Sequence, residues 1–282
     1  MDLDLRERVV FITGASGGLG QALADSFAAE GARLALQAHR HLRELRVFTE
    51  AHLQPDRTFV VGADVSDPAQ VHAAFSQTIE RFGRIDICIV NAGIWWEDSL
   101  RLDEMTTDRV RHTIAVDLLG AIWTARSFMR SLAADPPAES RRGASMTFIG
   151  STAGRFGESG HADYSASKAA LRGLVRSLKN EIVSLDPYAR VNMVEPGWVL
   201  TPMTHTALQA PETVQRIIRT MPIQQIARPI DIARAVLFLS SPRAARHISG
   251  EILTVAGGME GRIQWEAGEI DVAAIQRRME SD

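Results

Sequence analysis

The chain has 282 residues, of which 45% are hydrophobic and 23% are charged, as is ordinary for a globular protein that buries a sizeable core. Its formal net charge of −3 argues against nucleic acid as the main partner, because binding phosphates requires a basic face. The sequence has no apolar run of membrane-spanning length and no signal-peptide pattern in its acidic start, so we expect a cytoplasmic protein without a membrane partner.

Cysteine and histidine give no sign of a disulfide or of a metal site. The single cysteine, Cys88, lies in the apolar run IDICIVNAG, which favours a buried and unreactive side chain. Among the eight histidines, His39 and His41 stand two residues apart without a third ligand, which is typical of a solvated pair. We therefore expect no metal.

In its first third, the chain alternates between short apolar runs and longer segments with helical periodicity. The apolar runs predict buried strands over residues 8–13, 32–38, 58–64 and 85–93. The intervening segments predict helices over residues 20–30, 41–52 and 68–82. Asp67 followed by Pro68 is typical of a helix start. Strands that are apolar on both faces and separated by helices indicate a parallel sheet.

The same alternation continues to the end of the chain. Further strands are expected over residues 144–150, 189–197 and 251–258. Further helices are expected over residues 107–132, 161–184 and 230–239. The predicted fold is a single doubly wound Rossmann-type α/β domain over residues 1–282, with a seven-stranded parallel sheet and helices on both faces.

Three segments depart from this regular alternation. Residues 135–143 are polar and contain two prolines, which predicts a solvated loop. Residues 201–225 form a long connection between a strand and a helix, and we expect it to be a substrate lid. Residues 260–282 follow the last strand as a C-terminal extension, which is expected to pack on a neighbouring subunit or to fray.

The stretch TGASGGLG, residues 13–20, fits two opposite motifs. One is G-x-S-x-G, which presents Ser16 as a hydrolase nucleophile, but that motif needs earlier strands to supply an oxyanion donor, and only one precedes it. The other is a glycine loop, with Gly14, Gly18 and Gly20 between the first strand and the first helix, where backbone N–H groups favour a pyrophosphate. A tight turn without a ligand would show the same glycines, so other motifs must decide.

A serine, a tyrosine and a lysine in the segment STAGRFGESGHADYSASK favour a catalytic site. Tyr164 and Lys168 are four residues apart on a predicted helix, so they share one face. A phenol normally titrates at about pH 10, and a neighbouring ammonium lowers its pKa and tunes it for proton transfer. Ser151 closes the fifth strand at the sheet edge where ligands bind. The alternative is a surface Tyr–Lys pair.

With these motifs in place, the chain resembles the compact single-domain branch of the short-chain dehydrogenase/reductase (SDR) family, from about residue 5 to residue 259. The resemblance rests on TGASGGLG, Asp64-Val65, Asn91-Ala92-Gly93, the set Ser151, Tyr164 and Lys168, and Pro196-Gly197 followed by Val199 and Thr201. It implies that Ser151, Tyr164 and Lys168 are catalytic. The cofactor-binding residues that it implies are Gly14, Ser16, Gly18, Leu19, Gly20, Asp64, Val65, Asn91, Ala92, Gly93, Tyr164, Lys168, Pro196, Gly197, Val199 and Thr201.

One position departs from the family pattern. After the fourth strand the family usually carries asparagine in the setting V-N-x-x-G, whereas this chain has V-D-L-L-G with Asp117. In the family that residue helps hold a water linked to the lysine, so Asp117 is included among the expected catalytic residues. Its charge would stabilise the Lys168 cation, while the sequence leaves the direction of its effect on Tyr164 open. We expect activity to survive the change.

The resemblance implies an oxidoreductase that transfers a hydride reversibly between a nicotinamide cofactor and a ketone or secondary alcohol, like a carbonyl reductase or a 3-oxoacyl reductase. Tyr164 would exchange the proton on the substrate oxygen, and Lys168 would bind the nicotinamide ribose. The second strand ends without the acid that NAD-preferring relatives carry, and His39 and Arg40 could meet a 2′-phosphate, so NADP(H) is favoured over NAD(H). The alternative function is a catalytically impaired nucleotide-sensing module with the same fold.

The substrate pocket is expected to be apolar or aromatic, because tryptophans follow two of the family motifs. The residues expected around the substrate are Ser151, Trp95, Trp96, Phe156, His161, Trp198 and Met203. For Trp96, packing in the lid or in a subunit interface is an equal alternative. Family members usually form dimers or tetramers through the long helices around Asp117 and Tyr164, so we expect a homo-oligomer, such as a homotetramer.

Overall fold

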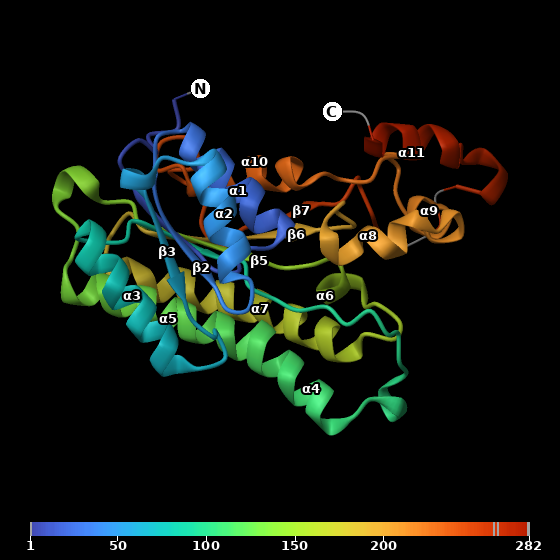
Figure 1. Ribbon diagram of the computed structural model, residues 1–282, viewed down its shortest axis with the longest axis horizontal. Coiled ribbons are helices and arrows are strands. Elements are labelled where there is room, and N and C mark those ends of the chain that lie inside the picture. The colour runs from blue at the N-terminus through green and yellow to red at the C-terminus, as the bar shows by residue number, and fades with distance from the viewer. Residues whose placement is uncertain (1, 262, 264, 281–282) are drawn as a thin grey trace.

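A seven-stranded parallel sheet forms the centre of the molecule (Figure 1). The computed structural model describes residues 2–261, 263 and 265–280. The strands pair in the order β3-β2-β1-β4-β5-β6-β7, and each neighbouring pair is parallel. Their bounds are β1 Val9–Ile12, β2 Arg33–Ala38, β3 Thr58–Gly62, β4 Ile87–Val90, β5 Ser145–Ile149, β6 Arg190–Pro196 and β7 Ile252–Val255. The strand order reverses between β1 and β4, where such sheets open a crevice for a ligand.

Helices cover both faces of this sheet, which confirms the predicted doubly wound α/β fold (Figure 1). One layer consists of α1 (Gly18–Ala29), α2 (Leu42–His52) and α10 (Pro229–Ser240). The other layer consists of α3 (Pro68–Phe82), α4 (Thr107–Ile114), α5 (Gly120–Ala134) and α7 (Ala162–Glu181). As predicted, α3 begins at Asp67, whose carboxylate accepts hydrogen bonds from the N–H groups of Ala69 (2.8 Å) and Gln70 (3.3 Å).

Each face of the sheet has its own hydrophobic core, because successive strand residues point to opposite faces. On β1, Phe11 points toward α3, where its ring lies 4.3 Å from the ring of Phe75. Its neighbour Val10 belongs to the opposite core, together with Leu23 and Phe27 of α1. Burying such a side chain contributes about 1.5–3 kcal/mol, so these contacts hold the sheet between its two helical layers.

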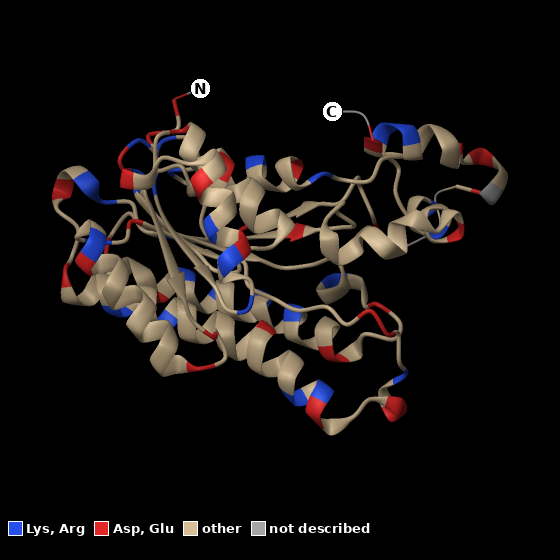
Figure 2. Ribbon diagram, viewed as in Figure 1, with Lys and Arg blue, Asp and Glu red and all other residues tan. Residues whose placement is uncertain are grey.

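Charged residues of both signs occur on the helices and loops of both layers (Figure 2). Two charged side chains are buried on β6. Arg190 donates to the carbonyls of Ser240 (3.1 Å) and Ala245 (3.3 Å), and Glu195 pairs with Arg172 of α7. These buried charges therefore tie both helical layers to one strand.

The helix predicted over residues 107–132 contains one wider turn. α4 leads into a π-helical turn at Ala115–Leu119, and α5 continues from Gly120. A π turn inserts an extra residue into a helix, and such turns are frequent at functional sites. Here the turn carries Asp117, so this side chain takes a direction that a regular helix would not give it.

The segment predicted to be a lid, residues 201–225, contains two short helices, α8 (Pro202–Gln209) and α9 (Pro211–Ile218). A further short helix, α6 (Ala153–Phe156), follows β5 and was not predicted. Both α6 and α8 lie at the carboxyl edge of the sheet, because they directly follow the loops that leave β5 and β6.

The described part of the C-terminal extension packs on α9 of its own chain, within the segment predicted to be a lid. It includes α11 (Val272–Glu280), whose Ile275 joins an apolar cluster with Val214 and Ile218 of α9. Arg219, directly after α9, donates from its Nε to the carbonyl of Trp265 at 3.1 Å. The extension therefore packs against α9 of the same chain. The sequence had led us to expect packing on a neighbouring subunit or fraying.

Candidate active site

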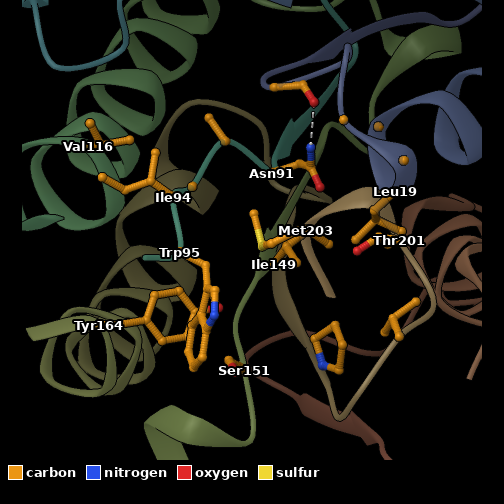
Figure 3. Close-up of a pocket in the computed structure, with 18 of the residues that line it drawn as sticks. Leu19, Asn91, Ile94, Trp95, Val116, Ile149, Ser151, Tyr164, Thr201 and Met203 are labelled. Atoms are coloured by element: carbon orange, nitrogen blue, oxygen red, sulfur yellow. Dashed lines mark hydrogen bonds between the residues drawn. The ribbon is translucent and has the colours of Figure 1, made fainter. Parts of the chain in front are cut away.

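A cavity of about 580 Å³ opens at the carboxyl edge of the sheet, on both sides of the strand reversal (Figure 3). The predicted site residues that line it are Gly14, Ser16, Gly18, Leu19, Gly20, His39, Arg40, Asp64, Val65, Asn91, Ala92, Gly93, Trp95, Ser151, Tyr164, Lys168, Pro196, Gly197, Trp198, Val199, Thr201 and Met203. Four other predicted residues, Trp96, Asp117, Phe156 and His161, are not among its lining residues.

The glycine loop after β1 forms the floor at one end of this cavity. Gly14 has a φ of +64°, and a Cβ there would lie 2.8 Å from the Cα of Ala92, so the position requires glycine. Asn91 fixes the loop by donating to the carbonyls of Thr13 (2.8 Å) and Gly14 (3.1 Å) (Figure 3). The N-cap of α1 is Gly17, which has no side chain to cap the helix, so the first N–H groups of α1 remain available to an anion.

Gln37, which was not predicted to be a site residue, fixes this loop through hydrogen bonds. It is 2% exposed, its Oε1 accepts from the N–H of Gly14 at 2.9 Å, and its carbonyl accepts from the N–H of Ala15 at 2.8 Å. Its Nε2 donates to the carbonyl of Ala63 after β3. The one signal in the sequence is a polar residue inside the apolar run ARLALQA.

The loops after β2 and β3 close the same end of the cavity. His39 and Arg40 follow β2, and His39 Nδ1 lies 3.7 Å from Asp64 Oδ2 after β3. Partial burial raises the pKa of Asp64, but hydrogen bonds from the Ser66 hydroxyl (2.7 Å) and N–H (2.9 Å) outweigh it and hold that pKa below its usual value. This end therefore combines basic side chains with one fixed carboxylate.

Ser151, Tyr164 and Lys168 meet at the other end of the cavity. The Ser151 hydroxyl forms a hydrogen bond with the phenol of Tyr164 and accepts another from the N–H of Ala153 at 3.1 Å. Tyr164 and Lys168 lie on one face of α7, as their spacing predicts, with Lys168 Nζ 5.6 Å from the centre of the Tyr164 ring. Lys168 is 4% exposed and donates to the carbonyl of Ile149 at 3.2 Å.

The Tyr164 phenol does not have the lowered pKa that its lysine neighbour led us to expect. Burial raises its pKa above the usual value of a phenol, the Asp117 carboxylate raises it further, and the hydrogen bond with Ser151 lowers it. Burial also lowers the pKa of Lys168, against the opposing effect of Asp117. The expectation was wrong because it left out burial, which raises the pKa of Tyr164 most, and because the effect of Asp117, which the sequence left open, raises it further.

Asp117 lies near Lys168, on the same side of the backbone of Gly93. A Cβ on Gly93 would lie 3.1 Å from Lys168 Nζ and 3.5 Å from Asp117 Oδ1, so both charged groups border this glycine. Asp117 is 0% exposed, and its Oδ1 accepts from the N–H of Ile94 at 2.8 Å. Burial raises its pKa to about 6, although Lys168 and the N–H of Ile94 both lower it.

The loop after β6 and the start of α8 form the wall opposite these groups. Val199 bridges to Ala227, and the N–H of Thr201 donates to the hydroxyl of Thr204 at 3.1 Å, which fixes the start of α8. Figure 3 shows Thr201 on the side of the cavity away from Tyr164, beside Leu19, and Met203 nearer the middle of the view. The predicted lid therefore begins at the cavity wall.

Aromatic rings surround the catalytic end of the cavity (Figure 3). The ring of Trp95 lies 4.9 Å from that of Tyr164 at 88° and 6.5 Å from that of Trp198 at 73°. His161 stacks on Trp95 with ring centres 3.7 Å apart and an angle of 22°. Burial lowers the pKa of His161, so a neutral imidazole supports the indole from outside the cavity.

Trp96 and Phe156 have other surroundings. Trp96 donates from Nε1 to the hydroxyl of Thr113 at 2.9 Å, beside the buried ion pair of Arg109 and Asp163 (3.2 Å). Phe156 ends α6 and is 38% exposed. The indole of Trp96 thus packs beside α4, outside the set of residues that line the cavity.

Other chemistry is sparse in the part of the chain that the structure describes. None of its helices combines the length and the apolar character needed to cross a membrane. The same residues contain no group of three or more His, Cys, Asp or Glu side chains that could hold a metal ion. Cys88 is buried on β4, where burial raises the pKa of its thiol and keeps it unreactive.

A dinucleotide suits the cavity at both of its ends. The free N–H groups of α1 and the side-chain-free glycine loop match a pyrophosphate, which needs donors and a close approach of backbone. At the other end, the Tyr164 phenol is placed to exchange a proton with a substrate oxygen. A glycine loop that suits a pyrophosphate, combined with a proton donor in the same cavity, defines the class of protein as a Rossmann-type oxidoreductase.

Known proteins are similar to this chain in sequence and in fold. A family model described as enoyl-(acyl carrier protein) reductase matches residues 14–260. The 3-oxoacyl-[acyl-carrier-protein] reductase MabA of Mycobacterium tuberculosis is 32% identical over 253 residues, which cover 89% of this chain and 92% of that protein.

Two solved structures from Brucella melitensis are also similar. A short-chain dehydrogenase/reductase has a TM-score of 0.81 and 30% identity, covering 90% of this chain and 97% of its own. A 3-ketoacyl-(acyl-carrier-protein) reductase complexed with NADH has a TM-score of 0.79 and 25% identity, covering 90% and 99%. The chain belongs to the short-chain dehydrogenase/reductase family, and the protein is an oxidoreductase of that family.

Proposed function

We propose that the protein catalyses reversible hydride transfer between NADP(H) and a ketone or secondary alcohol. The convergence of Ser151, Tyr164 and Lys168 at one end of a cavity whose other end is a glycine-loop floor carries this proposal. The similarity to a 3-oxoacyl-[acyl-carrier-protein] reductase supports a carbonyl substrate.

Each of the three residues has a distinct role in the reduction. The reduced nicotinamide, when bound, supplies a hydride to the carbonyl carbon. Tyr164 donates its phenolic proton to the carbonyl oxygen, while the Ser151 hydroxyl hydrogen-bonds that oxygen as negative charge develops on it. Lys168 binds the nicotinamide ribose and stabilises the phenolate that is left on Tyr164. Oxidation of the alcohol follows the same steps in reverse.

The preference for NADP(H) is supported by the side chains after β2. His39 and Arg40 both line the cavity, so a 2′-phosphate would meet a guanidinium and an imidazole there. The carboxylate at this end, Asp64, follows β3 and is held by Ser66. We expect kcat/KM to be about tenfold or more higher with NADPH than with NADH. Equal values, or a higher value with NADH, would reverse the assignment.

The substrate is proposed to be an apolar or aromatic carbonyl compound. Trp95, Trp198 and Met203 line the catalytic end of the cavity, together with Ile94 and Val116 from the loop after β4 and from the π turn. Flat and bulky apolar surfaces of this kind bind apolar substrates without adding polar groups that need partners. Aryl ketones should therefore be reduced with higher kcat/KM than small polar ketones of equal reactivity.

A nucleotide-sensing module without turnover is the alternative, and Asp117 is the residue that supports it. The deciding experiment mixes the protein with NADPH and a panel of aryl, alicyclic and 3-oxoacyl thioester ketones, and follows the absorbance of the reduced nicotinamide. Consumption of NADPH with formation of the alcohol would exclude the sensor. Tight NADPH binding without consumption for any ketone of the panel would overturn the enzymatic proposal.

Three organisational features belong to the same proposal. Helices α8 and α9 act as a lid, and Met203 contributes to the cavity wall while being 49% exposed. The enzyme forms a dimer or a tetramer through α4, α5 and α7, where Ile114 and Leu119 remain 36% exposed. A cytoplasmic location stays a prediction from the sequence. Sedimentation equilibrium tests the assembly, since a purely monomeric mass would contradict it.

A further inference from the structure

A buried carboxylate beside the reacting groups lacks the partners that usually accompany a buried charge. Asp117 is 0% exposed, and its Oδ1 receives the N–H of Ile94, whereas its Oδ2 has no hydrogen-bond partner among the described residues. Asp163 also has one oxygen without a partner, its Oδ1, but its Oδ2 receives both the Nε of Arg109 (3.2 Å) and the hydroxyl of Thr113 (2.8 Å), so its charge is paired. An unpaired buried charge costs far more than a buried neutral acid, so the surroundings of Asp117 favour its protonated form.

The groups that face Asp117 come from α7 and from the loop after β4. From α7, Lys168 supplies a cation, Asp163 an anion and Tyr164 a phenol. From the loop, Ile94 supplies a backbone N–H. Lys168 favours the ionised form of Asp117, while burial and Asp163 oppose it. These opposing effects bring the pKa of Asp117 to about 6, so its protonation can change near neutral pH beside Tyr164 and Lys168.

The charge state of Asp117 acts on both catalytic groups. Its carboxylate raises the pKa of Tyr164, which makes the phenolate harder to form. It also offsets the positive charge of Lys168, because both groups border the backbone of Gly93. When Asp117 is neutral, no carboxylate charge opposes the phenolate of Tyr164.

We propose that Asp117 is a positioning residue for the proton step, and that its neutral form supports alcohol oxidation better than its carboxylate. The inference rests on the proposed role of Tyr164 as the base in oxidation. Rising pH favours the phenolate, but above about pH 6 it also ionises Asp117, which disfavours the phenolate. The wild-type rate of oxidation should therefore rise with pH, flatten as Asp117 ionises, and rise again.

The first test compares the pH profiles of kcat/KM for oxidation of a secondary alcohol in the wild type and in Asp117→Asn. The two profiles should converge at about pH 5, where Asp117 is neutral, and separate above about pH 7, where the variant should be roughly tenfold faster for each pKa unit removed from Tyr164. Parallel profiles over the whole range would overturn the proposal, whichever protein is faster. Asp108→Asn, at the exposed start of α4, removes the same charge away from the site and should reproduce the wild-type profile.

A second measurement does not depend on turnover. The chain has two tyrosines, Tyr164 and the exposed Tyr188, so in a Tyr188→Phe background the phenolate absorbance reports Tyr164 alone. Adding Asp117→Asn should lower the pH at which Tyr164 ionises, and an equal or higher midpoint would overturn the proposal. Asp117→Ser removes the same charge and replaces Asp117→Asn if that variant does not fold. Failure of the proposed function would look different, because no alcohol would be oxidised while the midpoint would still fall.

Discussion

The two ends of the cavity differ in which atoms form them: backbone atoms dominate at the glycine-loop end, and side chains dominate at the end that contains Tyr164. At the glycine-loop end the backbone forms the proposed binding surface: Gly14 adopts a positive φ, α1 offers free N–H groups, and Gln37 and Asn91 hold the loop in place. At the catalytic end, side chains carry the proposed chemistry, and the pKa of Tyr164 depends on burial and on the charges around it. Binding at the glycine-loop end should thus depend on the shape of the backbone, and turnover at the other end should depend on charge. Mutations should therefore change binding and turnover separately.

The largest effect is expected at the catalytic end, from Tyr164→Phe. Removing the proton donor should lower kcat by about 10²–10⁴-fold, because general acid–base catalysis contributes this much. The dissociation constant for NADPH should stay within a factor of about two, because the glycine loop lies at the other end. Stopped-flow turnover and fluorescence titration measure the two quantities. Retained turnover would remove Tyr164 from the mechanism, and lost binding would show that the two ends are not separable.

The next largest effect concerns stability, and it comes from Asp117. Its pKa is raised from 3.8 to about 6 in the folded protein, so the folded state binds its proton more tightly than the unfolded state does. This contribution is fully present below about pH 4 and is lost as the pH rises through 6, a change of about 3 kcal/mol. Asp117→Asn removes this pH-dependent contribution. The free energy of unfolding of the variant, measured relative to that of the wild type, should therefore rise as the pH increases from about 4 to 7. Urea unfolding at several pH values would show this, and a constant difference would contradict it.

A smaller loss is expected at the glycine-loop end from Gln37→Leu. The variant keeps the size of the side chain but leaves the N–H of Gly14 and the carbonyl of Ala63 without their partner. Each unsatisfied group costs about 1–3 kcal/mol, so the free energy of unfolding should fall by about 2 kcal/mol or more, and NADPH should bind more weakly. The kcat at saturating NADPH should change little. A fall in kcat with unchanged binding would contradict the division between the two ends.

The backbone end was largely predictable from the sequence. Glycine at positions 14, 18 and 20 between an apolar run and a helical pattern specifies a loop that only a few folds use, and the strand and helix pattern specified the doubly wound sheet. The predicted and observed strands differ by at most three residues at their ends, since hydrogen bonding in the ladder, not hydrophobicity, decides where a strand stops. Gln37 was missed because its role depends on the loop that packs above it.

The side-chain end was predictable in its members but not in its electrostatics. The spacing of Tyr164 and Lys168 placed both on one face of α7, but a pKa depends on burial and on charges from distant segments. Asp117 reaches Gly93 through a π turn that no propensity indicates. Trp96 follows the same motif as Trp95, yet its indole donates to Thr113 and does not line the cavity, which the motif alone does not reveal.

The smallest expected effect separates the two cofactors at the glycine-loop end. Arg40 is exposed and lines the cavity after β2, where the 2′-phosphate of NADPH would lie. Exposed charge pairs contribute about 1 kcal/mol or less, so Arg40→Ser should lower kcat/KM for NADPH by up to about fivefold and leave the value for NADH unchanged. Arg43→Ser, also exposed and on α2, removes the same charge farther from the cavity and serves as the control.

Varying the salt concentration tests whether Arg40 distinguishes NADPH from NADH through its charge. If Arg40 binds the phosphate through charge, raising the ionic strength should reduce the advantage of NADPH in the wild type and should have little further effect in Arg40→Ser, because exposed charges are screened. An equal loss with NADPH and NADH in Arg40→Ser would mean that Arg40 supports the loop after β2 and does not recognise the phosphate. The shape-dependent end would then bind both cofactors alike, and the assignment of NADP(H) would fail while the hydride transfer at Tyr164 would stand.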